Sequence, residues 1–578
     1  MEAALPNSAF SDLVTRGGVG PVWSHGHEIL RRIFVTVRDR RWQEIAPTRW
    51  DSEIDDARRT ITMAARHTSD QVDFEWRGTF HITEDRRELG FEFAGKALRD
   101  MDICRLGLVV LHPVQSMVGA RVTAISAQSE QSLSVANVIS PQPIVNGIPK
   151  AMTEPFSELL IQRSDVGSLA VRFEGDLFEL EDQRNWGDAS FKTYCTPLRL
   201  GFPRTVRAGT SIAHTVQICF TPASARERLN RFAPAGVPTT PGIFPAVGRE
   251  IRSLSPQAQP DRDSPAWHHV HIVVPGEEPV AALREILESA PPTRIELGIE
   301  MEGEQTRSGD MFSLISAYHS RIARLLAYGA HTSAPAATVL ESWRQQMQTS
   351  AALREVPVLA ATRGYYVEFN RKVALVSQVS GIAFPLTATV HSDDAATIAD
   401  NVATICDMAE TARHLTQQNE LVVAPLALYH PASMVPQHFP RTLIVPWLAA
   451  TMIHCALGRI TSVTLSEYVV TALASTDLYA LPFLSSLVES AGLEIVPLDS
   501  DLPSRMHAAV FKSITERPGR ILAANDNAQP VRFTLAQTGL KAKTGRDAAT
   551  GASFAVNDRE IEIPGFGTVW IDLAGSEG

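Results

Sequence analysis

The sequence predicts a multidomain protein with an N-terminal antiparallel β-sandwich, a central (β/α)8 TIM-like barrel and a small C-terminal β-domain. Three observations lead to this prediction. The chain has 578 residues, which suggests three or four domains at roughly 100–200 residues each. Residues 1–232 and 513–578 carry strand patterns. Between them, over residues 266–512, strand patterns alternate with helical ones, as in a parallel barrel.

Residues 1–232 predict the sandwich because apolar and polar side chains alternate in short runs that Gly, Pro and Asp interrupt. The expected strands are 29–37, 74–82, 89–93, 103–111, 120–125, 169–180 and 212–220. Residues 233–265 contain seven prolines. Since proline resists both helix and central strand, we expect a linker or a surface strap there.

The barrel is expected over residues 266–512, a length that suits the TIM fold. Seven strands are expected at 270–274, 294–299, 324–328, 356–361, 381–387, 420–429 and 459–465. Helices are expected at 279–289, 311–322, 337–347, 395–415 and 443–457. The eighth strand should follow Tyr468. Residues 513–578 return to strand patterns, at 520–524, 531–535, 553–556 and 568–573.

Composition and charge exclude several classes of protein. The chain has 53 basic and 64 acidic side chains and a net charge of −11, which argues against a nucleic-acid partner. Its most apolar run, residues 443–458, is interrupted by Pro446 and His454 and is shorter than the ~20 residues that span a bilayer. No secretory signal pattern is visible, and the five cysteines are scattered without a CxxC pair. We expect a cytoplasmic protein without membrane contact, disulfides or a cysteine-based zinc site.

Two carboxylates are candidate catalytic residues, because active sites of TIM barrels lie at the C-terminal ends of the strands. Glu368 follows the fourth expected strand and Glu467 the seventh. Two such carboxylates can divide acid and base roles. Tyr365, Tyr366 and Asn370 flank the first and Tyr468 follows the second, a composition typical of sugar sites. The alternative is that each Glu is a surface or salt-bridged residue.

The fifth expected strand is followed by His391 and Asp394. His391 either lies over the barrel mouth, where it orients substrate or transfers a proton, or has no such role. Asp394 is a candidate for binding sugar hydroxyls. Ser392 or Asp393 is expected to cap the next helix.

The densest polar and aromatic run lies at residues 173–197, and many of its polar and aromatic residues fall within 181–192. Either it is a long connection with a salt-bridged surface, or it reaches over the barrel and supplies side chains to a hydroxylated or anionic ligand. The candidate ligand-binding residues are Asp182, Arg184, Asn185 and Lys192.

We expect no cofactor and no metal. The His-His-Val-His run at 268–271 lies at the start of a strand, away from the end where barrel hydrolases hold zinc. The sequence has no Walker A loop, no GxGxxG after a strand and no Gly-x-Ser-x-Gly elbow.

Several of these motifs resemble the D-apionate lactonase family. The long motif FEGDLFELEDQRNWGDASFKTYCTPL at 173–198 carries most of the resemblance, together with LGLVVLHP at 106–113, RGYYVEFNR at 363–371 and TVHSDD at 389–394. The resemblance extends from about Arg32 to the end of the chain. It implies a bacterial cytoplasmic enzyme of pentose catabolism that opens D-apionolactone, built on the sandwich–barrel–sandwich plan of clan-A glycoside hydrolases.

The predicted function is therefore hydrolysis of a sugar-derived lactone, D-apionolactone or a close aldonolactone. One of Glu368 and Glu467 would activate water and the other would protonate the leaving alkoxide. Arg363, His391 or a residue near Arg184 would stabilise the oxyanion. Hydroxyls of the substrate would contact Asn370, Tyr366, Asp394 and Asn185, with Tyr468 nearby. Two alternatives remain: a glycoside hydrolase that uses the same two Glu residues, and a non-catalytic carbohydrate-binding protein. No pattern indicates the oligomeric state.

Overall fold

The computed structural model describes residues 10–574, except 16, 225–239, 253–264, 275–279, 302–307, 330–334, 336, 372–378, 419, 430–439, 476–479, 499–501, 513–518, 537 and 558–559. The chain divides into two compact units. The first comprises Met1–Arg184 and Ser190–Ala235, and the second comprises Asn185–Ala189 and Gly236–Gly578. A short segment flanked on both sides by the first unit therefore belongs to the second.

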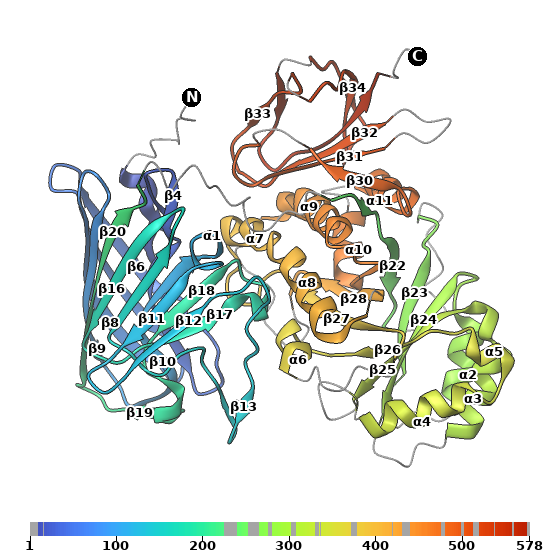
Figure 1. Cartoon of the computed structure of the whole chain (residues 1–578), viewed down its shortest axis with the longest axis horizontal. Helices are drawn as coiled ribbons and strands as arrows, with labels where there is room; N and C mark the ends of the chain where they lie inside the picture. The colour runs from blue at the N-terminus through green and yellow to red at the C-terminus, as the bar shows by residue number, and fades with distance from the viewer. Residues whose placement is uncertain are drawn as a thin grey trace. The chain divides into compact units, whose positions relative to one another are not determined.

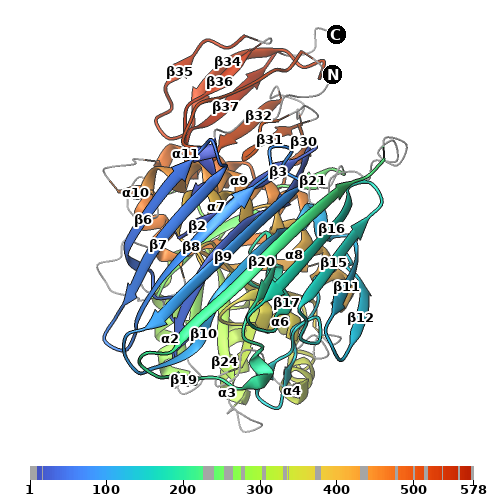
Figure 2. The same cartoon turned by 90° about the vertical axis from the view of Figure 1, so that its left-hand side faces the viewer.

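The first unit consists mainly of two antiparallel sheets, and the nine-stranded one faces the viewer in Figure 2. Its strand order is β12 (Glu130–Ser134), β11 (Arg121–Ile125), β15 (Glu158–Arg163), β16 (Gly167–Glu174), β20 (Ser211–Pro222), β9 (Glu88–Ala97), β8 (Asp73–Ile82), β7 (Thr60–Thr68) and β6 (Pro47–Asp55). The other sheet has the order β1 (Val14–Thr15), β2 (Gly18–Val19), β5 (Arg32–Asp39), β10 (Met101–Pro113), β18 (Ser190–Tyr194) and β17 (Glu179–Asp182), with β19 (Arg204–Val206) also on β10.

The alternation of apolar and polar residues that predicted these strands matches the alternation of buried and more exposed side chains in the structure. Along β8, Phe74, Trp76, Gly78, Phe80 and Ile82 are buried, while the residues that alternate with them are exposed or half-buried. Apolar side chains from both sheets form one continuous core because each sheet presents one apolar face. The described helices of this unit are single turns, such as α1 (Val114–Met117), and the 3₁₀ turn η2 (Gln183–Trp186) lies across the boundary between the two units. The predicted N-terminal antiparallel fold is confirmed.

Eight parallel strands close a barrel in the second unit (Figure 1). In order they are β22 (Ala246–Glu250), β23 (His269–Val274), β24 (Arg294–Met301), β25 (Ile322–Gly329), β26 (Val358–Ala361), β27 (Gly381–Thr387), β28 (Glu420–Ala427) and β29 (Ser462–Leu465). The helices between them are α2 (Val280–Ser289), α3 (Ser308–Ala317), α4 (Ala337–Met347), α5 (Ala351–Arg354), α6 (Tyr366–Arg371), α7 (Ala395–Asn401), α8 (Thr404–Thr416) and α9 (Ile444–Leu457).

The expected position of the missing strand was wrong. It is not after Tyr468 but at β22, which pairs with β23 on one side and β29 on the other. Pro245 precedes it directly, so the Pro-rich stretch contains the first barrel strand. Proline is tolerated there because it lies outside the strand and removes no ladder hydrogen bond. Every barrel strand therefore moves up by one place from its expected number.

The C-terminal strands form a second, mostly antiparallel sheet in this unit. Its order is β21 (Gly242–Ile243), β30 (Glu494–Pro497), β31 (Met506–Phe511), β32 (Arg520–Asn525), β37 (Thr568–Leu573), β34 (Ala542–Asp547) and β35 (Ser553–Phe554), and a separate pair joins β33 (Val531–Phe533) to β36 (Ile561–Ile563). Its strands β30 and β31 lie within residues 266–512, the range that was expected for the barrel. The helices α10 (Glu467–Ala474) and α11 (Leu481–Glu489) precede it.

The most apolar segment of the sequence is α9, and every residue of this helix is buried. It contacts α8 on the barrel side and β31 and β32 of the C-terminal sheet (Figure 1). A helix covered on all sides is expected to be apolar all round. Within the described part of the chain, no helix is both long and apolar enough to cross a bilayer.

Candidate active site

The two candidate carboxylates follow the fifth and eighth barrel strands rather than the fourth and seventh. Glu368 lies on α6 after β26, and Glu467 is the first residue of α10 after β29. The spacing of three strands is the same in both numberings. Both residues thus lie at the end of the barrel where TIM-barrel active sites are found.

The segment Asn185–Ala189 is fixed to the barrel unit by side chains of three helices. Asn370 of α6 donates from Nδ2 to Oδ1 of Asn185 at 2.8 Å. Asn401 of α7 accepts the backbone N–H of Ala189 at 2.9 Å, and Thr404 of α8 donates to the carbonyl of Gly187 at 3.0 Å. Gly187 has φ +85°, which glycine adopts without strain. Backbone and side chains together therefore position this turn.

Within this segment, Asp188 forms a hydrogen-bonded ion pair with Nδ1 of His391. Its other oxygen accepts a hydrogen bond from Nδ2 of Asn401 at 3.2 Å. Asp188 is buried, whereas 20% of the His391 side chain is exposed. A buried carboxylate on one ring nitrogen orients an imidazole. The role predicted for His391 over the barrel mouth stays a prediction.

Trp186 is surrounded by three side chains from the strand ends. Its ring centroid lies 5.5 Å from that of Tyr365 and 5.5 Å from that of His391. The guanidinium carbon of Arg371 lies 5.7 Å from the Trp186 ring centroid, and Nη1 of the same arginine contacts Oε1 of Glu368 at 3.0 Å. Glu368 is therefore linked through Arg371 to an aromatic group of the kind that binds the apolar faces of sugars.

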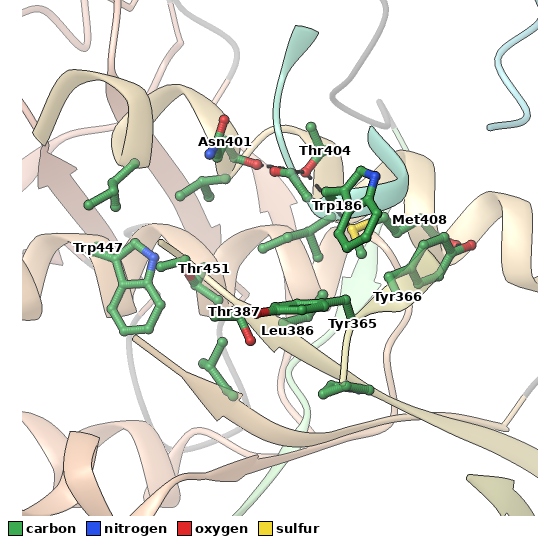
Figure 3. A pocket seen from close by; sticks show the side chains of 17 residues that line it. Trp186, Tyr365, Tyr366, Leu386, Thr387, Asn401, Thr404, Met408, Trp447 and Thr451 are labelled. Atoms are coloured by element: carbon green, nitrogen blue, oxygen red, sulfur yellow. Dashed lines mark hydrogen bonds between the residues drawn. The ribbon is translucent and has the colours of Figure 1, made fainter. Parts of the chain in front are cut away.

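A pocket lies beside this group, and Figure 3 shows the rings of Trp186 and Tyr365 along it. Its walls come from the C-terminal ends of β27 and β28 and from α7, α8 and α9. They are mainly apolar, with a few polar groups, as is usual for small-molecule sites. The residues that line it are Trp186, Gly187, Tyr365, Tyr366, Pro385, Leu386, Thr387, Ala388, Ile398, Asn401, Val402, Thr404, Ile405, Met408, Leu426, Trp447 and Thr451.

Comparison with known proteins identifies the family. Residues 6–223 match the model for the N-terminal domain of D-apionate lactonase, and residues 318–432 match the model for its TIM barrel domain. The chain belongs to the D-apionate lactonase family. A D-apionate lactonase from Brucella anthropi is 28% identical over 199 residues, which are 33% of this chain and 31% of that protein. The match therefore spans about a third of that relative's length.

Solved structures resemble the chain only weakly. A glycoside hydrolase family 30 xylanase from Clostridium acetobutylicum is 11% identical, covers 59% of this chain and 98% of its own, and has a TM-score of 0.38. A glucosidase from Croceicoccus marinus is 10% identical, with 59% and 97% coverage and a TM-score of 0.37. At such scores these likenesses carry no argument about function.

The long D-apionate lactonase motif is divided between the two units. Asp182 and Arg184 pair with each other in the first unit, with Nε at 2.9 Å and Nη2 at 2.7 Å from the carboxylate oxygens, and both side chains are almost completely buried. Lys192 donates to Oε1 of Gln183 at 3.1 Å and lies 3.6 Å from Glu181. Asp182, Arg184 and Lys192 thus have partners within the first unit, and their predicted contacts with a ligand stay predictions. Of the four candidates in this segment, Asn185 alone lies in the barrel unit.

Two further candidates bond within the barrel unit instead of presenting polar groups to the pocket. The hydroxyl of Tyr366 donates to the carbonyl of Met408 at 2.9 Å, so only its ring contributes to the pocket wall. Asp394 is the N-cap of α7 and accepts the N–H of Thr397 at 2.9 Å. The expected cap at Ser392 or Asp393 was one or two residues early. Asp394 therefore has a capping role, and its predicted contact with sugar hydroxyls stays a prediction.

The remaining candidates lie at other strand ends. Arg363 pairs with Glu300 and lies 5.0 Å from the Tyr328 ring centroid. Glu467 is exposed, and its backbone N–H lies 3.4 Å from Oε2 of Glu250. Tyr468 packs edge-on against Tyr429 with centroids 4.7 Å apart.

His269 and His271 of the histidine run are buried on β23, whereas His268 precedes the strand and is exposed. Nδ1 of His271 is 3.0 Å from Oε1 of Glu296, which also accepts the Thr464 hydroxyl at 2.9 Å, and Thr464 bonds Nε2 of His269 at 2.8 Å. Burial opposes the charge of Glu296, but His269, His271 and Arg324 outweigh it and lower its pKa to about 2. Burial lowers the pKa of His269 to about 4. These side chains form a buried polar network, which Tyr328 joins to Arg363 because its ring contacts both His271 and Arg363.

Sequence reasoning missed the two most informative residues, Trp186 and Asp188. Both lie in the polar run that the sequence singled out, but their longer charged neighbours were preferred. The available signal was Gly187 between them, because a glycine flanked by a tryptophan and an aspartate indicates a tight turn that presents both side chains.

Proposed function

We propose that this protein hydrolyses a sugar-derived lactone, D-apionolactone or a close aldonolactone, at the C-terminal end of the barrel. One observation supports the proposal: the Trp186 ring contacts Tyr365, His391 and Arg371. His391 pairs with Asp188, and Arg371 pairs with Glu368. Family membership supports the class of reaction, and the name of the Brucella anthropi relative supports the choice of lactone.

In the proposed mechanism, Glu368 is the general base. It removes a proton from water as the water oxygen attacks the lactone carbonyl, and a tetrahedral oxyanion forms. Arg371, which contacts Glu368, holds the carboxylate in place and lies near enough to the Trp186 ring to face the same ligand. Arg363 is the proposed donor to the oxyanion. Collapse of the intermediate then breaks the bond to the ring oxygen.

The ring oxygen leaves as an alkoxide and requires a proton. We propose Glu467 as the second carboxylate for this step, with His391 as the competing donor because Asp188 orients its ring. The substrate lies against Trp186 and Tyr365, where its apolar face contacts the rings. Asn370 positions the segment through Asn185.

The test is a pH-indicator assay on a panel of aldonolactones that includes D-apionolactone, beside nitrophenyl glycosides. Glu368→Gln should fold and lose at least ~100-fold in kcat, within the range for a general base. Glu341→Gln is a matched control because Glu341 also pairs with an arginine three residues later, Arg344, on an exposed helix surface. It should retain normal kcat.

Glu467→Gln and His391→Asn separate the two proton donors, since only the variant that lacks the true donor should lose kcat strongly. If the protein turns over glycosides and no lactone, the proposal is wrong and the protein is a glycosidase. Binding without turnover in the wild type would indicate a carbohydrate-binding protein.

A further inference from the structure

Three metal-ligating side chains converge in the N-terminal unit, away from the candidate active site. Asp176 follows β16, Cys195 follows β18, and His214 lies in β20. One ligand atom from each can be chosen so that all three lie within 4.8 Å of one another. Cys195 and His214 are buried, and Asp176 is half-buried.

The distances suit a shared metal ion. Sγ of Cys195 lies 3.4 Å from Nδ1 of His214. With Zn–S near 2.3 Å and Zn–N near 2.05 Å, a tetrahedral ion separates its sulfur and nitrogen ligands by about 3.6 Å. A carboxylate, an imidazole and a thiolate are all common zinc ligands, and a water molecule would complete four-coordination.

The backbone leaves room for this cluster. Gly107 has φ +137°, and a Cβ at this position would lie 2.4 Å from Cε1 of His214 and 2.5 Å from Sγ of Cys195. Gly175 has φ +94°, and its Cβ would lie 2.9 Å from Cδ2 of His214. Any side chain at either position would collide with the imidazole or the thiol. The two glycines therefore permit the approach of the ligands.

Outer contacts orient the carboxylate. Oδ2 of Asp176 accepts the Thr196 hydroxyl at 2.5 Å, and Oδ1 accepts the N–H of Leu177 at 2.7 Å. Each carboxylate oxygen accepts more than one bond, so a lone pair remains available. Hydrogen bonds of this kind fix ligand orientation in metal sites.

We propose that Asp176, Cys195 and His214 bind one zinc ion that links the two sheets of the N-terminal unit. Cys195 follows a strand of one sheet and His214 lies in a strand of the other, so the ion joins them as a structural cross-link. Binding converts the Cys195 thiol to a thiolate, and the proton passes to the buffer. No cysteine spacing in the sequence predicted this site, because its ligands lie on three separate parts of the chain.

The experiment uses full-length protein treated with a chelator and then loaded with Co²⁺ or Zn²⁺. Elemental analysis after desalting should find one equivalent of metal. The Co²⁺ form should show the visible spectrum of a tetrahedral ion together with a thiolate-to-cobalt charge-transfer band. Zinc should also raise the urea midpoint of unfolding.

Cys195→Ser should abolish the charge-transfer band, and Asp176→Asn should weaken metal affinity about 10–100-fold. Cys406→Ser is the matched control, because Cys406 also lies near a histidine nitrogen, 3.7 Å from Nδ1 of His454, but this pair belongs to no three-ligand group among the described residues. It should leave the spectrum unchanged. All variants are made in a Cys219→Ser background, since Cys219 is exposed.

Failure to retain metal, or a charge-transfer band that survives Cys195→Ser, would overturn the proposal and leave the thiol as a hydrogen-bond donor to His214. If Cys195→Ser does not fold, Asp176→Asn decides alone through its effect on affinity. These readouts do not involve lactone turnover, so they remain separate from the proposed catalytic function.

Discussion

Two parts of one polar run, residues 181–192, have different environments. Its flanks belong to the first unit, where Arg184 has no exposed side-chain surface and forms a bidentate pair with Asp182. Its middle belongs to the second unit, where Asp188 pairs with His391 and Trp186 lies among aromatic and cationic side chains. In sequence the two parts have the same polar and aromatic character.

The difference shows that charge density alone does not locate a ligand site. Arg184 also donates to the carbonyls of Ala136 and Asn137, so its donors are used within the unit. The middle of the run bonds mostly through backbone atoms and short side chains, which leaves the Trp186 ring beside the pocket. The long charged residues of the flanks anchor the segment, and the turn between them carries the groups that can meet a ligand.

The largest expected effect is on stability, at the flank. Arg184→Met leaves the buried carboxylate of Asp182 without its partner, which typically costs about 3–5 kcal/mol. Urea unfolding followed by circular dichroism would measure the loss. Arg207→Met is the control, because the Arg207–Asp100 pair is exposed and exposed ion pairs contribute little to stability. Equal losses in the two variants would contradict the structural role assigned to Arg184.

The buried carboxylate of Glu296 inside the barrel should have a comparable effect on stability. This effect appears as a dependence of the unfolding free energy on pH. The pKa of Glu296 is about 2 in the folded protein against an ordinary 4.5, so the unfolded chain binds its proton first as the pH falls. Its contribution to stability is complete above pH 4.5 and is lost as the pH falls toward 2. His269, with a pKa near 4, adds a loss of the same sign between pH 6.5 and 4.

Glu296→Gln should therefore flatten the dependence of the unfolding free energy on pH between 4.5 and 2, measured by urea titration at several pH values. Glu410→Gln, at an exposed position on α8, is the comparison. An unchanged slope in Glu296→Gln would show that the buried network does not govern acid lability.

For the middle of the run, the expected effect is on catalysis. Asp188→Asn keeps the size of the side chain but removes the charge that pairs with His391. If this pair orients the imidazole for the proposed reaction, kcat should fall by 10²-fold or more. The unfolding free energy should fall by only about 1–3 kcal/mol, as for one charged hydrogen bond. A normal kcat with reduced stability would place Asp188 with the anchoring residues instead.

The sequence predicted the fold class and seven of the barrel strands, because period-2 and helical patterns survive wherever one face of an element is buried. It failed at β22 for a physical reason: this short strand lies in a proline-rich context that resembles a linker. At the site, Asn185, Asn370 and His391 are brought together as parts of one polar group. Trp186 was missed because a ring contact between segments nearly 180 residues apart, such as that of Trp186 with Tyr365, leaves no local pattern.

A smaller effect is expected at Trp186 itself. Trp186→Leu keeps an apolar side chain but removes the ring that faces Tyr365, and KM for the lactone should rise about tenfold, which corresponds to about 1.4 kcal/mol. The value of kcat should change less, because the ring contacts ground state and transition state alike. Steady-state kinetics of the two constants would test this division. A fall in kcat at constant KM would instead indicate that Trp186 positions His391.

The smallest expected effect is at Lys192, and it completes the comparison between flank and middle. This ammonium group bonds Gln183 and lies near Glu181, and its side chain is 16% exposed. Lys192→Met keeps the aliphatic stem and should cost only about 0.5–1 kcal/mol, the lower part of the range for one hydrogen bond, because most of the packing is retained. Both kcat and KM should match the wild type. A rise in KM comparable to that of Trp186→Leu would mean that the flank also contacts substrate, and the division of the polar run into anchoring and ligand-facing parts would then be wrong.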